Sequence, residues 1–146
     1  MVFSFHAIGN AFFILPEPSI WGLLMVGVAV IGASSDRSKF SNKAVRAYLS
    51  EGFEVYPVNP REQLIEGLVC YRSVGEIEKE IDVALFYVTP GIGMQLVDGV
   101  AQKGVKSIYL NPGADSDELE AKAKSLGIEV LRECAIRALG IVPDEI

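Results

Sequence analysis

Two short loops in this sequence carry residue types that can hold phosphate groups. In the first, the apolar run Val28–Ile31 ends in the small polar loop Gly32-Ala33-Ser34-Ser35, and a helical pattern follows over Ser41–Ser50. A strand, a glycine turn and a helix in this order are typical of a nucleotide-binding βαβ unit, in which backbone N–H groups at the helix N-terminus meet a phosphate. Gly32 lets the backbone approach a ligand closely. The hydroxyls of Ser34 and Ser35 can donate to a pyrophosphate.

The second loop differs from the one expected in enzymes that use NAD. The buried run Val55–Val58 stops at Asn59-Pro60-Arg61. NAD enzymes normally place an acidic residue near this strand end, where it holds the ribose hydroxyls. Arg61 instead offers a planar fork suited to a phosphate monoester, and Val58 and Pro60 would form an apolar wall for an adenine. The sequence therefore favours a nucleotide with an additional phosphate over NAD.

Two further strand ends supply small, polar and proline residues. Val88-Thr89-Pro90 follows one apolar run, and Asn111-Pro112-Gly113 follows the next. Because the carboxyl ends of parallel strands meet at one edge of a sheet, we expect these loops to lie beside the first two. Such residues also dominate ordinary turns, so turn chemistry alone is the alternative for any single loop. Lys39 could add a cation to the site, with a solvated surface lysine as the equal alternative.

The chain resembles the small single-domain CoA-binding proteins in three places. These are the run VAVIGAS at 28–34, the segment YLSEGFEVYPVNPR at 48–61 and the strand end Tyr87-Val88-Thr89-Pro90. The fold of that family is similar to the CoA-binding domain of the succinyl-CoA synthetase alpha subunit, and the resemblance covers about Val26 to Leu139. It implies CoA as the ligand, with Thr89 to Ile92 beside the nucleotide or the pantetheine arm. It also implies that Asn111-Pro112-Gly113 lies near the thiol end.

Cys134 is the one candidate for redox chemistry. The segment Arg132-Glu133-Cys134-Ala135-Ile136 resembles the closing motif of the family. A CoA thiol nearby could form a mixed disulfide with Cys134 by thiolate exchange, and a buried cysteine with a packing role is the alternative. Many relatives continue with a glutamate and a histidine, whereas this chain continues Arg137-Ala138-Leu139-Gly140, so no role of those two residues carries over.

The alternation of apolar runs and amphipathic patterns predicts an α/β, Rossmann-like fold, a single domain with a doubly wound parallel sheet of five strands. The predicted strands are Val26–Ile31, Glu54–Val58, Val83–Val88, Ser107–Leu110 and Ile128–Leu131. The predicted helices are Ser41–Ser50, Val74–Glu80, Gly91–Lys103 and Asp117–Ser125. With right-handed crossovers we expect the strand order 3-2-1-4-5, which opens a ligand crevice at the carboxyl ends of strands one and four.

Local signals support the predicted helix ends. Ser73 followed by Glu76 fits a capping box, and Thr89-Pro90 fits an N-cap followed by proline at the first helical position. Gly52, Gly104 and Gly127 each follow a predicted helix, where a left-handed residue is favoured.

Size and composition limit the class of protein. The chain has 146 residues, of which 50% are hydrophobic and 22% charged, as in one globular domain. The formal net charge of -6 argues against a nucleic-acid surface. Cys70 and Cys134 form no C-x-x-C pair, so we expect two reduced thiols in a cytoplasmic protein.

Residues 1–25 are predicted to be an apolar N-terminal extension of a CoA-binding domain at 26–146. The extension has no basic n-region and no small-residue cleavage pattern. Gly9, Asn10 and two prolines interrupt it before it could span a membrane. We expect it to pack outside the sheet, or to serve a homodimer or a partner protein. Met25 could also begin a complete domain, which would make residues 1–25 a misassigned start.

Catalytic machinery is not evident in the sequence. His6 is the only histidine and lies outside the resemblance, so a Ser-His-Asp, Cys-His or metal-ligand cluster near the crevice is not expected. We therefore favour a protein that binds CoA or an acyl-CoA and does not by itself transform it. The alternatives are a redox or sensor protein that binds NADP or NAD, and a Rossmann-like interaction module without a ligand.

Overall fold

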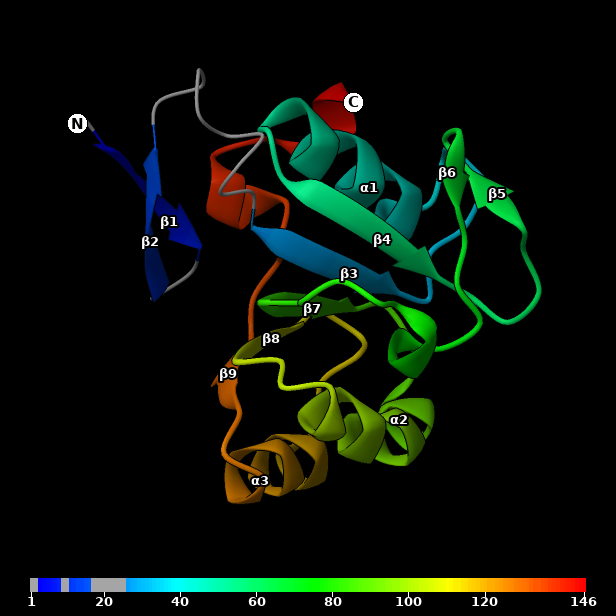
Figure 1. The fold of residues 1–146 in the computed structure, drawn as a ribbon, viewed down its shortest axis with the longest axis vertical. Coiled ribbons are helices and arrows are strands. Elements are labelled where there is room, and N and C mark those ends of the chain that lie inside the picture. Colours follow the sequence, from blue (N-terminus) through cyan, green and yellow to red (C-terminus); the bar gives the residue numbers. More distant parts are fainter. Residues whose placement is uncertain (1–2, 9–10, 17–25) are drawn as a thin grey trace.

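The computed structural model describes residues 3–8, 11–16 and 26–146, the first two ranges by their backbone (Figure 1). Its strands are β1 (Phe3–Ile8), β2 (Ala11–Pro16), β3 (Gly27–Ile31), β4 (Glu54–Val58), β5 (Leu64–Ile65), β6 (Leu68–Val69), β7 (Val83–Phe86), β8 (Ser107–Leu110) and β9 (Glu129–Leu131). Its α-helices are α1 (Phe40–Ser50), α2 (Pro90–Gln102) and α3 (Asp117–Ser125). The 3-10 turns are η2 (Val74–Glu76), η3 (Arg137–Leu139) and η4 (Pro143–Glu145).

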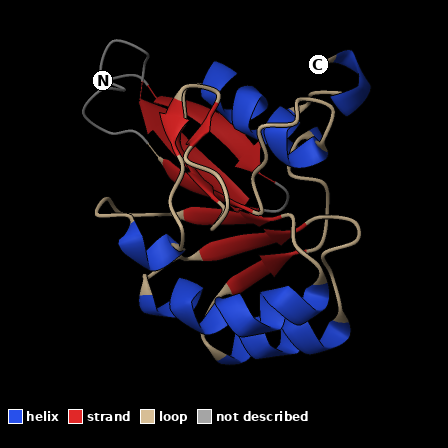
Figure 2. Cartoon of the chain, turned by 90° about the vertical axis from the view of Figure 1, so that its right-hand side faces the viewer, coloured by secondary structure: helices blue, strands red, loops and turns tan. Residues whose placement is uncertain are grey.

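Five parallel strands form the central sheet, in the order β4-β3-β7-β8-β9. Helix α1 and turn η3 cover one face, and helices α2 and α3 cover the other (Figures 1 and 2). Both faces of β3 are buried, with Val28 and Val30 in the core on the α1 side and Ala29 and Ile31 in the core on the α2 side. This double burial explains why β3 is an uninterrupted apolar run.

The structure confirms the Rossmann-like α/β fold and its parallel sheet, with one correction to the strand assignment. An isolated parallel bridge joins Val58 to Tyr71 beyond β4. With Tyr71 counted as the third strand, the six positions read 3-2-1-4-5-6 from this edge, and the first five of them have the predicted order. The sequence analysis gives the third place to Val83–Val88, which is wrong, because Val83 pairs with Val28 on the other side of β3. The switch between the two halves of the sheet therefore lies at the carboxyl ends of β3 and β7.

Three of the four predicted helices are confirmed to within one residue at either end, and the helix predicted at Val74–Glu80 is wrong. Only the turn Val74–Glu76 forms, because the backbone is already extended at Ile77 (φ −78°, ψ 119°). Gly75 in its middle weakens helix formation. The predicted capping box is also incomplete, since the Ser73 side chain makes no cap hydrogen bond and the Glu76 carboxylate accepts from the N–H of Arg72.

The expected helix boundaries at proline and glycine are confirmed. Pro90 is the first residue of α2, although the Thr89 hydroxyl makes no cap hydrogen bond. The glycines after α1, α2 and α3 adopt positive φ angles of 88°, 85° and 84°, at Gly52, Gly104 and Gly127. Each of these glycines returns the chain toward the next strand.

The N-terminal segment forms a hairpin outside the central sheet. Strands β1 and β2 pair in antiparallel fashion, from Phe3 opposite Pro16 to Ile8 opposite Ala11. The sequence analysis assigns no strand here, although Gly9-Asn10 between two apolar runs is a hairpin signal. Strand β1 lies beside η3 in the fold (Figure 1). Within the described ranges, no helix is both long and apolar enough to cross a membrane.

Candidate functional site

The glycine turn after β3 is held tightly against its neighbours. The N–H groups of Gly32 and Ala33 donate to the Val58 carbonyl at 3.0 and 3.2 Å, which ties the turn to the end of β4. Gly32 has a φ of +84°, and a Cβ there would lie 2.6 Å from the Tyr87 carbonyl oxygen and 2.8 Å from Cγ1 of Val88. Because the Tyr87 backbone and the Val88 side chain occupy the space that a Cβ would need, a residue without a side chain is required.

The loop between Gly32 and α1 is folded on itself by short polar contacts. The Ser34 hydroxyl accepts from the N–H of Asp36 at 3.0 Å, and the N–H of Ser35 donates to the Glu62 carboxylate at 2.9 Å. The Asp36 carboxylate accepts from the hydroxyl of Ser38 at 2.7 Å and from its N–H at 3.0 Å, which holds the pKa of Asp36 below its ordinary value. The Ser34 hydroxyl proton stays available to a ligand.

Asn42, in the first turn of α1, holds this loop in place and is not among the site residues predicted from the sequence. Its side chain is fully buried, and its Nδ2 donates to the Ser34 carbonyl at 2.9 Å and to the Glu66 carboxylate at 3.2 Å. Its Oδ1 accepts from Nε of Arg46 at 2.8 Å. The only signal in the sequence is an asparagine inside a helical pattern, where this residue type is unfavourable.

The N-terminus of α1 presents unpaired amides at the same edge of the sheet. The N–H groups of Asn42 and Lys43 donate to the Lys39 carbonyl at 3.1 Å. The N–H groups of Phe40 and Ser41 have no hydrogen-bond acceptor in the described part of the chain. An eleven-residue helix directs its positive end at this point, which favours an anion.

Asn59 joins the first loop to the second. Its Nδ2 donates to the Ala33 carbonyl at 2.8 Å, and its Oδ1 accepts from the N–H of Arg61 at 2.8 Å. Its own N–H donates to the Tyr71 carbonyl at 2.9 Å. Asn59 thus positions both loops, a role that the sequence analysis did not foresee.

Two cavities open along the carboxyl edge and share Gly32 and Val88. The first, which we call the α2-side cavity, has a volume of about 720 Å³ and lies between the end of β4, turn η2 and helix α2. The second, the α1-side cavity, has a volume of about 630 Å³ and lies between the N-terminus of α1, the loops after β7 and β8, and the C-terminal segment. The two cavities thus adjoin at the switch in the sheet.

The structure brings thirteen of the seventeen predicted site residues to these cavities. Those on the α2-side cavity are Gly32, Val58, Asn59, Pro60, Arg61, Val88 and Ile92. Those on the α1-side cavity are Gly32, Lys39, Val88, Thr89, Asn111, Pro112, Gly113 and Cys134. The predicted residues that line neither cavity are Ala33, Ser34, Ser35 and Pro90. Ala33 is fully buried in the core on the α1 side, so only its backbone is near the site.

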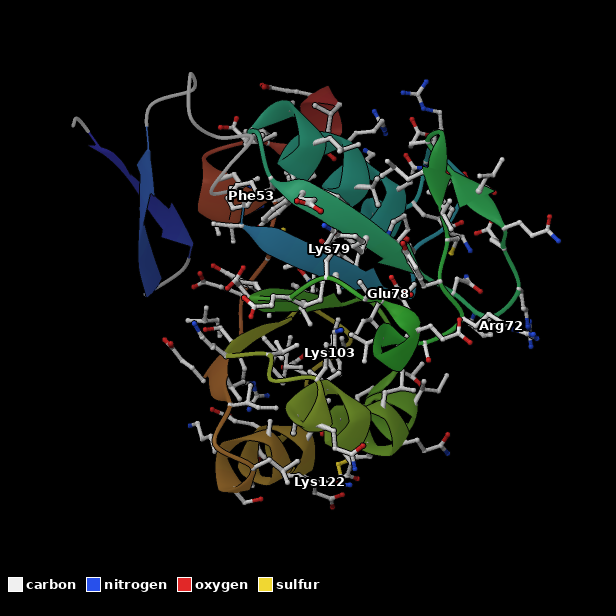
Figure 3. The ribbon with its side chains drawn as sticks, in the orientation of Figure 1. Phe53, Arg72, Glu78, Lys79, Lys103 and Lys122 are labelled. Carbon is white, nitrogen blue, oxygen red and sulfur yellow. The ribbon has the colours of Figure 1, made fainter. Side chains whose placement is uncertain are left out.

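The α2-side cavity is positively charged in a protein that is acidic overall. Arg61, Arg72 and Lys103 line it, and no aspartate or glutamate does. The whole chain, by contrast, has 13 basic and 19 acidic residues. Figure 3 shows Arg72 beside the connection after β6 and Lys103 near α2, well apart from it, and the Lys103 ammonium donates to the Ile77 carbonyl. Arg72 is a site residue that sequence reasoning missed, because nothing local marks its segment as the neighbour of β4.

The α1-side cavity is organised by the buried amide of Asn111. Its Nδ2 donates to the Phe86 carbonyl at 3.0 Å, and its Oδ1 accepts from the N–H of Ala135 at 2.8 Å. These two bonds hold the segment with Cys134 against the ends of β7 and β8. Cys134 is a half-buried free thiol that lines the cavity, whereas Cys70 is buried below the second loop, where burial raises the pKa of its thiol.

Three tyrosines share the core on this side with Cys134. The Tyr48 hydroxyl donates to the Ala135 carbonyl at 2.8 Å. The hydroxyls of Tyr87 and Tyr109 have no hydrogen-bond partner in the described part of the chain. Burial raises the pKa of all three phenols well above the ordinary value, so they stay neutral. Across residues 26–146 and the two described N-terminal strands, no group of three or more potential metal ligands is found.

Comparison with known proteins agrees with this arrangement. The protein family described as CoA binding domain matches residues 27–139. The chain belongs to this family. The alpha subunit of an ADP-forming acetate–CoA ligase II from Pyrococcus furiosus is 34% identical over 120 residues, which cover 78% of this chain and 26% of the relative. This CoA-binding domain therefore spans about a quarter of the length of that relative.

Solved structures of small proteins match nearly end to end. A hypothetical protein from Pyrococcus horikoshii has a TM-score of 0.75 at 29% identity and covers 85% of this chain and 89% of its own. A conserved hypothetical protein from Pyrococcus furiosus has a TM-score of 0.67 at 39% identity and covers 73% of this chain and 91% of its own. The CoA-binding domain thus occurs in small proteins as well as in the large ligases.

One wall of the site lies beyond the part that matches the family. Pro143 and Asp144, in turn η4, line the α1-side cavity, although the family match ends at 139. The ammonium of Lys43 on α1 donates to the Pro143 carbonyl at 2.8 Å and ties η4 to the helix. The C-terminal turn of this CoA-binding domain therefore contributes to the cavity from outside the residues that the family model matches.

Proposed function

We propose that this chain binds coenzyme A along the carboxyl edge of its sheet, with the nucleotide in the α2-side cavity and the pantetheine arm in the α1-side cavity. The observation that carries the proposal is the meeting of the two cavities at Gly32 and Val88. Arginines line one cavity and a free cysteine lines the other. This shape suits a long ligand with an anionic nucleotide at one end and a thiol at the other.

The diphosphate of CoA would lie at the junction. There, Gly32 permits a close approach, and the unpaired N–H groups of Phe40 and Ser41 can donate to phosphate oxygens. Lys39 lines the same cavity and would add a charge-assisted hydrogen bond. Ser34 and Ser35, on the adjoining loop, would approach the diphosphate from outside the two cavities.

The adenine would occupy the apolar part of the α2-side cavity. Val58 and Pro60 line it from the second loop, and Ile92 and Leu96 line it from α2. Ile92 is 46% exposed and Leu96 36%, so both offer apolar surface that a ring could cover. The lack of a carboxylate on this cavity's wall disfavours NAD, whose ribose hydroxyls need an acceptor.

We assign binding, and no reaction of its own, to this chain. Of the carboxylates at the site, Glu62 already accepts from the N–H of Ser35, and Asp144 lines the α1-side cavity from turn η4, without a histidine beside it among the described residues. The phenols near Cys134 are held neutral by burial. The ligase activity in the names of the longer relatives belongs to proteins of which this domain is about a quarter.

A thermal-shift panel tests the proposed function. A ligand that binds only the folded state stabilises it by about 2.7 kcal/mol at one hundred times its Kd, which for a domain of this size raises Tm by roughly 5–10 °C. We expect this rise with CoA and with acetyl-CoA, and no comparable rise with NAD or ATP. A larger shift with NADP than with CoA would replace the proposal by the NADP-binding alternative, and no shift with any of the five would favour the interaction module.

The placement of the thiol end predicts a selective disulfide at Cys134. With CoA disulfide as the reagent, the Cys134 thiolate would attack one sulfur, form a Cys134–CoA disulfide and release one CoA thiolate. We expect intact-mass spectrometry to show one added CoA, which reductant removes. Cys70 should stay unmodified because it is buried and its thiol pKa is raised. An unmodified wild type, or an unchanged adduct in Cys134→Ser, would leave Cys134 with a packing role.

A further inference from the structure

Arg72 lies in a chain segment that runs beside the second loop. The parallel bridge between Val58 and Tyr71 places the two chain segments side by side. The N–H of Tyr71 donates to the Pro57 carbonyl and the N–H of Asn59 donates to the Tyr71 carbonyl, both at 2.9 Å. Arg72 therefore comes directly after Tyr71, the outermost position of the sheet, just as Asn59 comes directly after β4. Figure 3 shows Arg72 beside the loop that leaves β4.

Local contacts fix the backbone from which each arginine side chain extends. The Tyr56 and Tyr71 rings lie 6.0 Å apart, and the N–H of Arg72 donates to the Glu76 carboxylate at 3.3 Å. On the other segment, the N–H of Arg61 donates to Oδ1 of Asn59. Both side chains are exposed and both line the α2-side cavity.

Neither guanidinium is neutralised. In the described part of the chain, Arg61 and Arg72 have no ion-pair partner. Glu62 accepts from the N–H of Ser35 and Glu76 from the backbone N–H of Arg72, and neither carboxylate forms an ion pair with one of these guanidinium groups. Two free guanidinium groups on adjacent segments, in a cavity without a carboxylate, indicate a doubly charged ligand group between them.

We infer that Arg61 and Arg72 form a single clamp for a phosphate monoester, and that the α2-side cavity selects adenine nucleotides that carry a 3′-phosphate. For CoA, this inference rests on the proposed function. It also extends to nucleotides without a pantetheine arm, of which adenosine 3′,5′-bisphosphate is the simplest. Each guanidinium offers two parallel N–H donors, so two of them can satisfy the phosphate oxygens from two sides.

Matched ligand pairs isolate the 3′-phosphate. CoA and dephospho-CoA differ only in this group, and so do adenosine 3′,5′-bisphosphate and AMP. By calorimetry, we expect the wild type to bind the first member of each pair more tightly. Arg61→Ala and Arg72→Ala should each weaken that member about 10- to 100-fold, the loss of charge-assisted hydrogen bonds, and leave the second member nearly unchanged. In the double variant, the two members of a pair should bind equally.

Two controls separate the clamp from general effects. Lys79→Ala removes a cation from the same connection between β6 and β7 but away from Arg72 (Figure 3), and should change neither pair. Arg72→Lys keeps the positive charge without the planar guanidinium fork and should recover part of the preference for the 3′-phosphorylated ligand.

Equal losses of affinity for both members of a pair in Arg72→Ala would exclude Arg72 from the clamp, and CoA binding itself would still stand. Tighter binding of adenosine 2′,5′-bisphosphate than of adenosine 3′,5′-bisphosphate would overturn the selectivity for a 3′-phosphate. If adenosine 3′,5′-bisphosphate bound more tightly than AMP while CoA did not bind at all, only the proposed function would be overturned.

Discussion

Gly32→Ala is expected to destabilise the fold and to abolish ligand binding. The left-handed backbone at Gly32 (φ +84°) costs an alanine about 1–2 kcal/mol. The added Cβ also meets the Tyr87 carbonyl oxygen at 2.6 Å, and relieving that contact should cost about 1–3 kcal/mol more. Because Gly32 lines both cavities, the shift that relieves the contact would separate β3 from β7 where the ligand crosses. Urea unfolding and a CoA titration measure the two effects.

Gly127→Ala is the matched control for this variant. Gly127 has the same φ of +84°, and a Cβ there would meet nothing within 4 Å. It lines neither cavity, so the control should lose only the backbone contribution and keep CoA binding. If both variants lost the same stability and bound CoA alike, the close approach of the Tyr87 carbonyl to Gly32 would not matter for CoA binding.

Asn111→Asp is expected to destabilise the fold strongly, although the two side chains are nearly isosteric. The Asn111 side chain is 3% exposed, and its Nδ2 donates to the Phe86 carbonyl. An ionised carboxylate would place an oxygen against that carbonyl oxygen and bury a charge with no cation beside it, which costs about 3–5 kcal/mol. The other carboxylate oxygen could still accept from the N–H of Ala135, so the loss is expected at the Phe86 carbonyl.

The loss in Asn111→Asp should depend on pH. Burial raises the pKa of the new carboxyl in the folded state above its unfolded value of about 3.9. Such a group leaves stability intact below the unfolded pKa, where a neutral carboxyl can still donate to Phe86, and reduces stability as pH rises through the window between the two values. Chemical unfolding at pH 4 and pH 7 checks this sign. The same loss relative to wild type at both pH values would contradict a carboxyl whose pKa is raised by burial at this position.

The elements and the edge of the sheet that carries the site could be predicted because local rules determine them. The apolar run Val28–Ile31 is buried on both faces, Pro90 begins α2, and the three glycines after the helices have left-handed backbones. Each of these features depends on a few neighbouring residues. Since parallel strands gather their carboxyl ends at one edge, knowing the strands was enough to bring most of the candidate residues together.

The rest depends on contacts between residues distant in the sequence. Arg72 reaches the site only because Tyr71 pairs with Val58, and no periodic pattern marks a strand of one residue. The same absence of a pattern explains the misplaced third strand. Asn111 and Ala135 are 24 residues apart, and Lys43 and Pro143 are 100 apart. A single asparagine or lysine in a sequence does not indicate which distant carbonyl or N–H it will meet.

Calorimetric titration of the whole chain with CoA tests the central claim most directly. We expect one CoA per chain, displacement by acetyl-CoA at the same site, and loss of the binding heat in Gly32→Ala but not in Gly127→Ala. Absence of binding heat with CoA at concentrations that saturate other nucleotide sites, together with binding of NAD, would contradict it.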